Sequence, residues 1–105
     1  MSKFYNITGS TGVTVELISP TEDNTNIKSI LLTNVHATAD ATITLFIQNV
    51  TYDKTASTYN IIHTIAIPAD SSLLLDNSSM FRFDDFYGLY ITVGSSDTVD
   101  VIISS

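Results

Sequence analysis

The side chains that could act as bases near neutral pH are two histidines, His36 and His63. His36 follows one apolar run of the chain and His63 lies within another. Nucleophilic catalysis by such a base needs a nucleophile within hydrogen-bond reach and an acid that orients the ring. Serine and threonine are so abundant that a nearby hydroxyl does not mark this arrangement. We therefore expect isolated strand histidines and assign no catalytic residue.

Paired carboxylates occur at Glu22-Asp23 and at Asp84-Asp85. A glycosidase needs two carboxyls that face each other about 5 to 10 Å apart, whereas adjacent strand residues point to opposite faces. A calcium ion needs several loop oxygens, and either doublet could supply some, but the regular spacing of an EF-hand loop is absent. We expect solvated loop acids and no metal site, and the sequence leaves calcium or sugar binding by these loops open.

Composition excludes several further classes of site. The chain has no cysteine, so disulfides, thiolate zinc sites and cysteine nucleophiles are absent. Its four glycines form no phosphate-binding motif, and no cofactor is expected. The net charge of −7 argues against binding the phosphate backbone of nucleic acid. No apolar run approaches the ~18 residues of a membrane-spanning helix, so no membrane contact is expected.

Apolar and polar residues alternate with a period of two over nearly every apolar stretch. The clearest examples are residues 13–17, 41–47, 89–93 and 99–103. The runs at 27–35 and 61–67 are apolar on both faces, which is typical of central strands or of strands whose second face meets a partner. Seven or eight short strands without a convincing helix predict one domain over residues 1–105, an all-β antiparallel β-sandwich of the jelly-roll type.

Turn-forming residues separate the predicted strands. Residues 37–40 are short enough for a hairpin, and residues 94–97 are interpreted as the hairpin loop between the last two strands. Pro68 cannot donate a hydrogen bond to a sheet, so a strand over residues 70–76 is expected to begin after it.

The inward rows of these strands predict the core. Its leading members are Ile30, Leu32, Ile43, Leu45, Ile47, Ile65, Leu89, Ile91, Val99 and Val101. Apolar residues that face the other way exceed what a small sandwich can hide. They are Ile18, Ile27, Leu31, Phe46, Ile62 and Leu74. Exposed apolar patches usually mark protein interfaces, which favours a homo-oligomer or a docking protein over a free monomer.

Two features select the candidate interface residues. Phe46 stands in an outward row of hydroxyls and amides, which resembles an anchor within a polar rim. Residues 77–87 concentrate aromatic side chains, and we expect a loop there with a strand fragment over 80–83. The candidate interface residues are Phe46, Leu31, Ile62, Phe81, Phe83, Phe86 and Tyr87.

Residues 27–104 resemble small virion proteins of tailed bacteriophages. Those proteins share an Ile-x-Ser-Ile-x-Leu-x-Asn strand, an alternating strand, an Ile-Pro-Ala-Gly-x-Ser-Leu step, a Gly-Leu-x-Ile segment and a final Asp-Val strand. The matching segments here are residues 27–34, 41–47, 67–73, 88–91 and 100–101. Asp70 stands where those proteins have glycine, so the turn after Pro68 must tolerate a Cβ atom or differ in shape.

The resemblance implies a non-enzymatic β-sandwich component of a virion and supplies no catalytic residue. Its most specific form is a capsid decoration (cement) protein, assembled in the host bacterial cytoplasm. Its partners would be itself, as a homo-oligomer such as a trimer, and the major capsid protein or other virion proteins. A neck, tail or fibre-associated protein is the alternative within this class. From another class, a carbohydrate-binding sandwich would use residues 81–87, although the chain has no tryptophan to serve as a sugar platform.

Overall fold

The computed structural model describes residues 3–9, 14–18, 27–49, 58–76, 87–94 and 97–104. All regular secondary structure in these segments is β-strand, as predicted. The strands are β1 (Lys3–Thr8), β2 (Thr14–Ile18), β3 (Ser29–Asn34), β4 (Ala41–Asn49), β5 (Thr58–Ile67), β6 (Ser72–Leu75), β7 (Tyr87–Val93) and β8 (Thr98–Ser104). Many of their residues are β-branched or aromatic, and such side chains pack well on a pleated surface.

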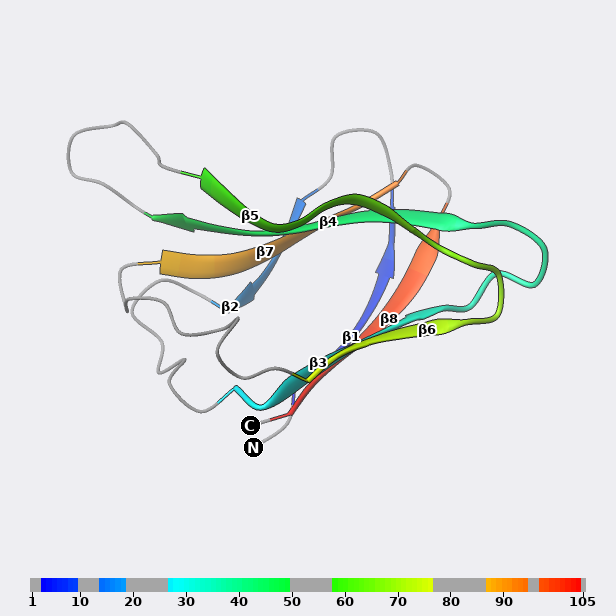
Figure 1. Ribbon diagram of the computed structural model, residues 1–105, viewed down its shortest axis with the longest axis horizontal. Coiled ribbons are helices and arrows are strands. Elements are labelled where there is room, and N and C mark those ends of the chain that lie inside the picture. The colour runs from blue at the N-terminus through cyan, green and yellow to red at the C-terminus, as the bar shows by residue number, and fades with distance from the viewer. Residues whose placement is uncertain are drawn as a thin grey trace.

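The strands form two four-stranded sheets that face each other (Figure 1). Sheet A has the order β1-β8-β3-β6, and sheet B has the order β2-β7-β4-β5. Every pair of neighbouring strands is antiparallel. This arrangement of eight strands in two sheets is that of a jelly roll, which confirms the predicted fold class. The first and last strands lie side by side, because β1 pairs with β8.

Most consecutive strands lie in opposite sheets, and both predicted hairpins are wrong for this reason. Residues 37–40 lead from β3 in sheet A to β4 in sheet B, and the connection after β7 leads from sheet B to β8 in sheet A. Among the described strands, only β4 and β5 are both consecutive and hydrogen-bonded to each other. A short connection can cross between sheets as readily as it can close a hairpin, so loop length did not distinguish the two.

The core lies between the two sheets, where their inward rows meet, and most of its predicted members are confirmed. Those with no exposed surface are Ile30, Leu32, Ile43, Leu45, Leu89, Ile91, Val99 and Val101. Ile47 is partly buried and packs against this cluster. Ile18 and Ile27 are also buried, contrary to their predicted outward direction. The register shift after Glu16 interrupts the alternation of β2, so Ile18 is buried next to Leu17. Ile27 lies before the start of β3, so the alternation of that strand does not determine its direction.

Strand β5 departs from simple alternation, which corrects two further predictions. Ile65 pairs with Ile43 but Ile62 pairs with Leu45, so β5 carries an extra residue between these pairs. Such a β-bulge shifts the faces that the following side chains occupy. Ile62 therefore packs against the core instead of facing outward. Ile65 lies on an edge strand and is 36% exposed, so its assignment to the core is wrong.

The bulge is held by a side chain of the neighbouring strand. Thr64 lies within the bulge and has φ of 53°, a left-handed backbone conformation that β-branched residues seldom adopt. Its N–H donates a hydrogen bond to Thr44 Oγ1 at 3.0 Å. Bulges are a common means of interrupting an edge strand, which otherwise offers a row of free backbone groups to another chain.

One polar side chain is fully buried among the described residues, that of Asn34 at the end of β3. Its Nδ2 donates to the carbonyl oxygens of Ala39 at 2.8 Å and Ile67 at 2.9 Å. Its Oδ1 accepts a hydrogen bond from the backbone N–H of His36 at 2.9 Å. A buried amide is tolerated when its donors and acceptor are paired. Asn34 thus ties the segment after β3 to the end of β5 in the opposite sheet.

Candidate interaction surfaces

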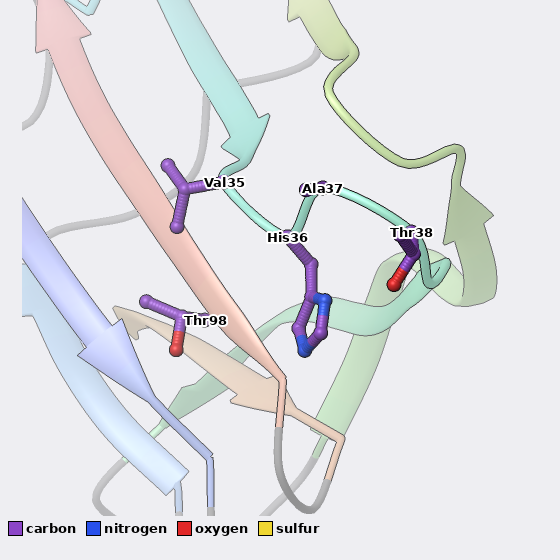
Figure 2. A pocket seen from close by; sticks show the side chains of 5 residues that line it. All are labelled: Val35, His36, Ala37, Thr38 and Thr98. Atoms are coloured by element: carbon purple, nitrogen blue, oxygen red, sulfur yellow. The ribbon is translucent and has the colours of Figure 1, made fainter.

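The structure places His36 beside an open hollow of about 330 Å³ at one end of the sandwich (Figure 2). The other residues that line it are Val35, Ala37, Thr38 and Thr98. Among the described residues that line the hollow none is acidic, so none of them supplies a carboxylate to orient the imidazole as a catalytic base.

The other candidates for chemistry are not gathered into a site within the described residues. His63 is exposed on the edge strand β5. The doublets Glu22-Asp23 and Asp84-Asp85 lie outside the residues that the structure describes. Across the described segments, no group of three or more His, Cys, Asp or Glu side chains is placed to hold a metal ion. The same segments contain no helix with the length and apolar character needed to cross a membrane.

The outer face of sheet B carries a row of four side chains, one from each strand, which we call the aromatic row. Cross-strand pairing joins Glu16 to Tyr90, Tyr90 to Phe46 and Phe46 to Asn60. The rings of Phe46 and Tyr90 stack, with centroids 5.6 Å apart and planes inclined by 17°. The Tyr90 hydroxyl donates a hydrogen bond to the Glu16 carboxylate at 3.3 Å. Cross-strand pairs of this kind stabilise a sheet and also fix the geometry of its surface.

The two aromatic side chains of the aromatic row, Phe46 and Tyr90, are half-buried, whereas Glu16 and Asn60 are exposed. Burial raises the pKa of Tyr90, and the negative charge of Glu16 and its hydrogen bond raise that pKa further. Beside the row, the hydroxyls of Thr14 and Thr92 lie 3.0 Å apart. The half-buried Phe46 therefore sits in a polar surround, the arrangement common at the centre and rim of protein interfaces.

The outer face of sheet A carries a second row, which we call the apolar row. Cross-strand pairing joins Phe4 to Ile102, Ile102 to Leu31 and Leu31 to Leu74. The row therefore crosses all four strands of the sheet. Its two ends are the most exposed, with Phe4 at 71% and Leu74 at 55%, while Ile102 and Leu31 are half-buried. Aligned apolar side chains on an outer face form a contiguous patch, the feature that marks interaction surfaces.

A polar row borders the apolar row on the same face. Its cross-strand partners are Asn6, Asp100, Thr33 and Ser72. Asn6 Nδ2 donates to Asp100 Oδ1 at 2.5 Å, and the hydroxyls of Thr33 and Ser72 lie 2.8 Å apart. Asp100 is the one charged side chain that the four strands direct outward on this face, and this contact engages it.

The structure distributes the predicted interface residues over different parts of the molecule. Phe46 lies in the aromatic row and Leu31 in the apolar row. Ile62 packs against the core. Tyr87 begins β7, and its ring centroid lies 6.0 Å from that of Tyr59. Three candidates lie outside the described residues: Phe81, Phe83 and Phe86.

Three members of the two rows were not among the interface residues predicted from the sequence: Phe4, Ile102 and Tyr90. Each of them alternates along its strand with more buried residues, and this alternation is the signal that could have indicated its outward direction. The rows themselves depend on strand pairing. Phe4 and Ile102 are neighbours because β1 pairs with β8, and alternation within a strand cannot reveal that pairing.

Comparison with known proteins assigns no family. No protein-family model and no curated protein matches the chain. Among solved structures, a chain in the structure of the Gx strain of infectious bursal disease virus is similar, with 15% sequence identity and a TM-score of 0.44. The similarity covers 98% of this chain and 33% of that one, so this chain spans about a third of that neighbour. At this TM-score the similarity assigns no function, and the phage resemblance of residues 27–104 stays a prediction.

Proposed function

We propose that this chain is a non-enzymatic structural protein of a virus particle and acts through protein–protein contacts. The observation that carries the proposal is the outer surface of the sandwich. Both sheets direct large apolar or aromatic side chains outward, in rows bordered by hydroxyl, amide or carboxylate groups. Flat faces of this kind suit contact with other protein surfaces, whereas small-molecule sites are concave. Jelly rolls serve both viral capsid proteins and lectins, so the fold is compatible with this role and does not select it.

The more specific form of the proposal is a capsid decoration protein of a tailed bacteriophage, which assembles in the host bacterial cytoplasm and binds the shell as a homo-oligomer. Its support is the resemblance of residues 27–104. At about 25 cal/mol per Å² of buried apolar area, a few hundred Å² at each contact contributes several kcal/mol. Repetition over a symmetric shell multiplies this stabilisation. A position at the neck, tail or a fibre would use the same surfaces.

Within this proposal, Phe46 is the anchor that contacts the particle. The substitution Phe46→Asp removes the stacked ring and places a charge at the centre of the aromatic row. Because Phe46 is outside the core cluster, we expect the isolated chain to stay folded by circular dichroism. We expect it to lose co-sedimentation with purified particles. Thr58→Asp is the matched control, since it adds the same charge at an exposed position of the same sheet.

The contact residue and the virion role are tested by separate measurements. Binding of Phe46→Asp at the level of the Thr58→Asp control would remove Phe46 from the contact. Mass spectrometry of purified virions tests the role itself, and absence of the chain from virions of the source phage would overturn it.

A carbohydrate-binding module is the second candidate, favoured by one observation. The aromatic row sets the stacked rings of Tyr90 and Phe46 between a carboxylate and an amide, and ring faces combined with hydrogen-bonding groups suit sugars. Titration of glycans monitored by tyrosine fluorescence distinguishes this function from the first. Saturable binding that Phe46→Asp abolishes would favour the module over the structural protein.

A further inference from the structure

We infer that two bulges in β5 form a protective device, which prevents the strand of another chain from adding to the free edge of sheet B. This role goes beyond the proposed function and does not depend on it, because any sandwich with such an edge must be kept from pairing with its neighbours. Its physical basis is the length, the composition and the register of β5.

Strand β5 is a long edge strand, and no described strand pairs with its outer side. It has 10 residues, whereas the other three edge strands, β1, β2 and β6, have 6, 5 and 4. Most of its side chains are exposed. A long exposed edge offers a row of free backbone N–H and C=O groups on which another chain can form a strand.

The composition of β5 lacks the usual chemical protection of an edge. The strand, Thr58–Ile67, contains no Asp, Glu, Lys, Arg or proline. Natural edge strands are commonly protected by lysine or other charges, or by proline. An uncharged segment rich in isoleucine, threonine and tyrosine is also of the kind that forms sheets between chains. Protection of this edge therefore has to come from the conformation of its backbone.

The register of β5 against β4 is interrupted twice, and β5 bends along its length (Figure 1). Residues 58–60 pair in one register and residues 65–67 in another, while Ile62 pairs alone between them. No regular stretch within β5 thus exceeds three residues, whereas strands usually have about five or six. An added strand would find no straight edge of ordinary length to follow.

The second bulge holds its shape against the local preference of the chain. Thr64 has φ of 53°, and its N–H donates to Thr44 Oγ1 on the neighbouring strand. A β-branched residue in this conformation is strained, and such strain persists where the surrounding structure imposes it and is common where it serves a function. Interruption of the edge is the function that we assign to it.

The register identifies the residues whose removal would straighten the edge. Deletion of Thr64 leaves every observed β4–β5 pair possible and lengthens the longest regular stretch from three residues to five. Deletion of Ile61 as well leaves eight of the 10 residues of β5, opposite the eight residues 41–48 of β4, again with every observed pair. The matched control is Thr64→Gly, which removes the same side chain but keeps the bulge, because glycine adopts a φ of 53° freely.

Sedimentation velocity of the full-length chains over a range of concentrations measures association, and circular dichroism with urea unfolding verifies that each variant folds. We expect association to increase from the unmodified chain to the single and then the double deletion. The association constant should rise at least about tenfold overall, since each further backbone hydrogen bond strengthens the contact. Thr64→Gly should associate no more than the unmodified chain. Ala66→Lys, at an exposed position of β5, should reverse the gain when it is added to the double deletion, because lysine on an edge opposes strand addition.

Equal association of the unmodified chain and the folded deletion variants would overturn the inference. A gain that Thr64→Gly reproduces, or that Ala66→Lys leaves unchanged, would also overturn it, because the added association would then not depend on the straightened edge. If the double deletion alone does not fold, Ala66→Lys is combined with the single deletion and the same comparison decides. Failure of the single deletion to fold would mean that the sandwich itself requires the bulge, which overturns the protective role.

Discussion

Replacing Asn34 by aspartate tests the assignment of its buried amide as the link between the two sheets. Asn34→Asp preserves the shape of the side chain and the oxygen that accepts the His36 N–H. It removes both Nδ2 donors and faces the carbonyl oxygens of Ala39 and Ile67 with a carboxyl group. Because the side chain at this position has no exposed surface, water cannot solvate the introduced carboxyl group there.

The expected loss can be worked out from these contacts. A buried polar group without its partner costs about 1–3 kcal/mol, and an uncompensated buried charge costs about 3–5 kcal/mol. Ile67 is almost fully buried, whereas Ala39 is exposed and its carbonyl can bond water. We therefore expect a loss of about 3–5 kcal/mol at neutral pH, against a total stability of roughly 5–15 kcal/mol for a small domain.

The pH dependence gives the prediction its sign. Burial beside two carbonyl oxygens raises the pKa of the introduced carboxyl in the folded chain. Stability is therefore largest below the pKa of the unfolded chain, and it falls as the pH rises through the interval between the unfolded and folded values. Urea unfolding at acidic and neutral pH measures this, with the exposed Asn60→Asp as control. A loss below about 1 kcal/mol at neutral pH, or the same pH dependence in the control, would refute the reasoning.

Three further outcomes are expected. Leu45→Ala should lower the free energy of unfolding by about 2–5 kcal/mol, since Leu45 has no exposed surface, and a loss below about 1 kcal/mol would contradict its place in the core. Gly9→Ala should cost about 1–3 kcal/mol in urea unfolding, because its Cβ would overlap the carbonyl oxygen of Gly94, and an unchanged midpoint would contradict that close approach. Glu16→Gln should lower the pKa of Tyr90, but not to the ordinary value of a tyrosine, because burial is the first cause of the shift. Phenolate absorbance as a function of pH measures this pKa, and an unchanged titration would contradict the role of Glu16.

Alternation predicted the fold class and most of the core because each strand has one buried face. Leu45 and Ile91, for example, lie in rows where every second residue is buried. Alternation failed at the bulges, because one inserted residue reverses the faces and leaves no distinct signal in the sequence. Ile62 was misassigned for this reason. Ile65 shares the face of its partner Ile43, but it lies on an edge strand and is therefore 36% exposed.

The turn after Pro68 was partly predictable from one residue. Asp70 stands where the resembling virion proteins have glycine, and its φ is 57°, a conformation that glycine adopts freely. Aspartate tolerates this region better than most residues. The N–H of Ser71 donates to the carbonyl oxygen of Pro68 at 3.2 Å and closes the turn. The turn thus accommodates the Cβ atom of Asp70 in a left-handed backbone conformation.

The interaction surfaces were the least predictable part. Leu31 and Phe46 were selected one at a time, from their direction within a strand. The rows that contain them arise from pairing between strands far apart in the chain, such as β1 with β8. Pairing of this kind is set by how the whole sandwich packs, and a pattern with a period of two within one strand carries no information about it.

The position of β8 between β1 and β3 also determines the order in which sheet A can form. Both neighbours are synthesised well before residues 98–104, and their contacts with β8 must wait until that strand has been synthesised. At about 5–20 residues per second, that wait lasts several seconds during translation. Pairing across such distances in the chain also slows folding. Substitutions within β8 are therefore expected to reduce the yield of native chain during expression, even where the finished sandwich would tolerate them.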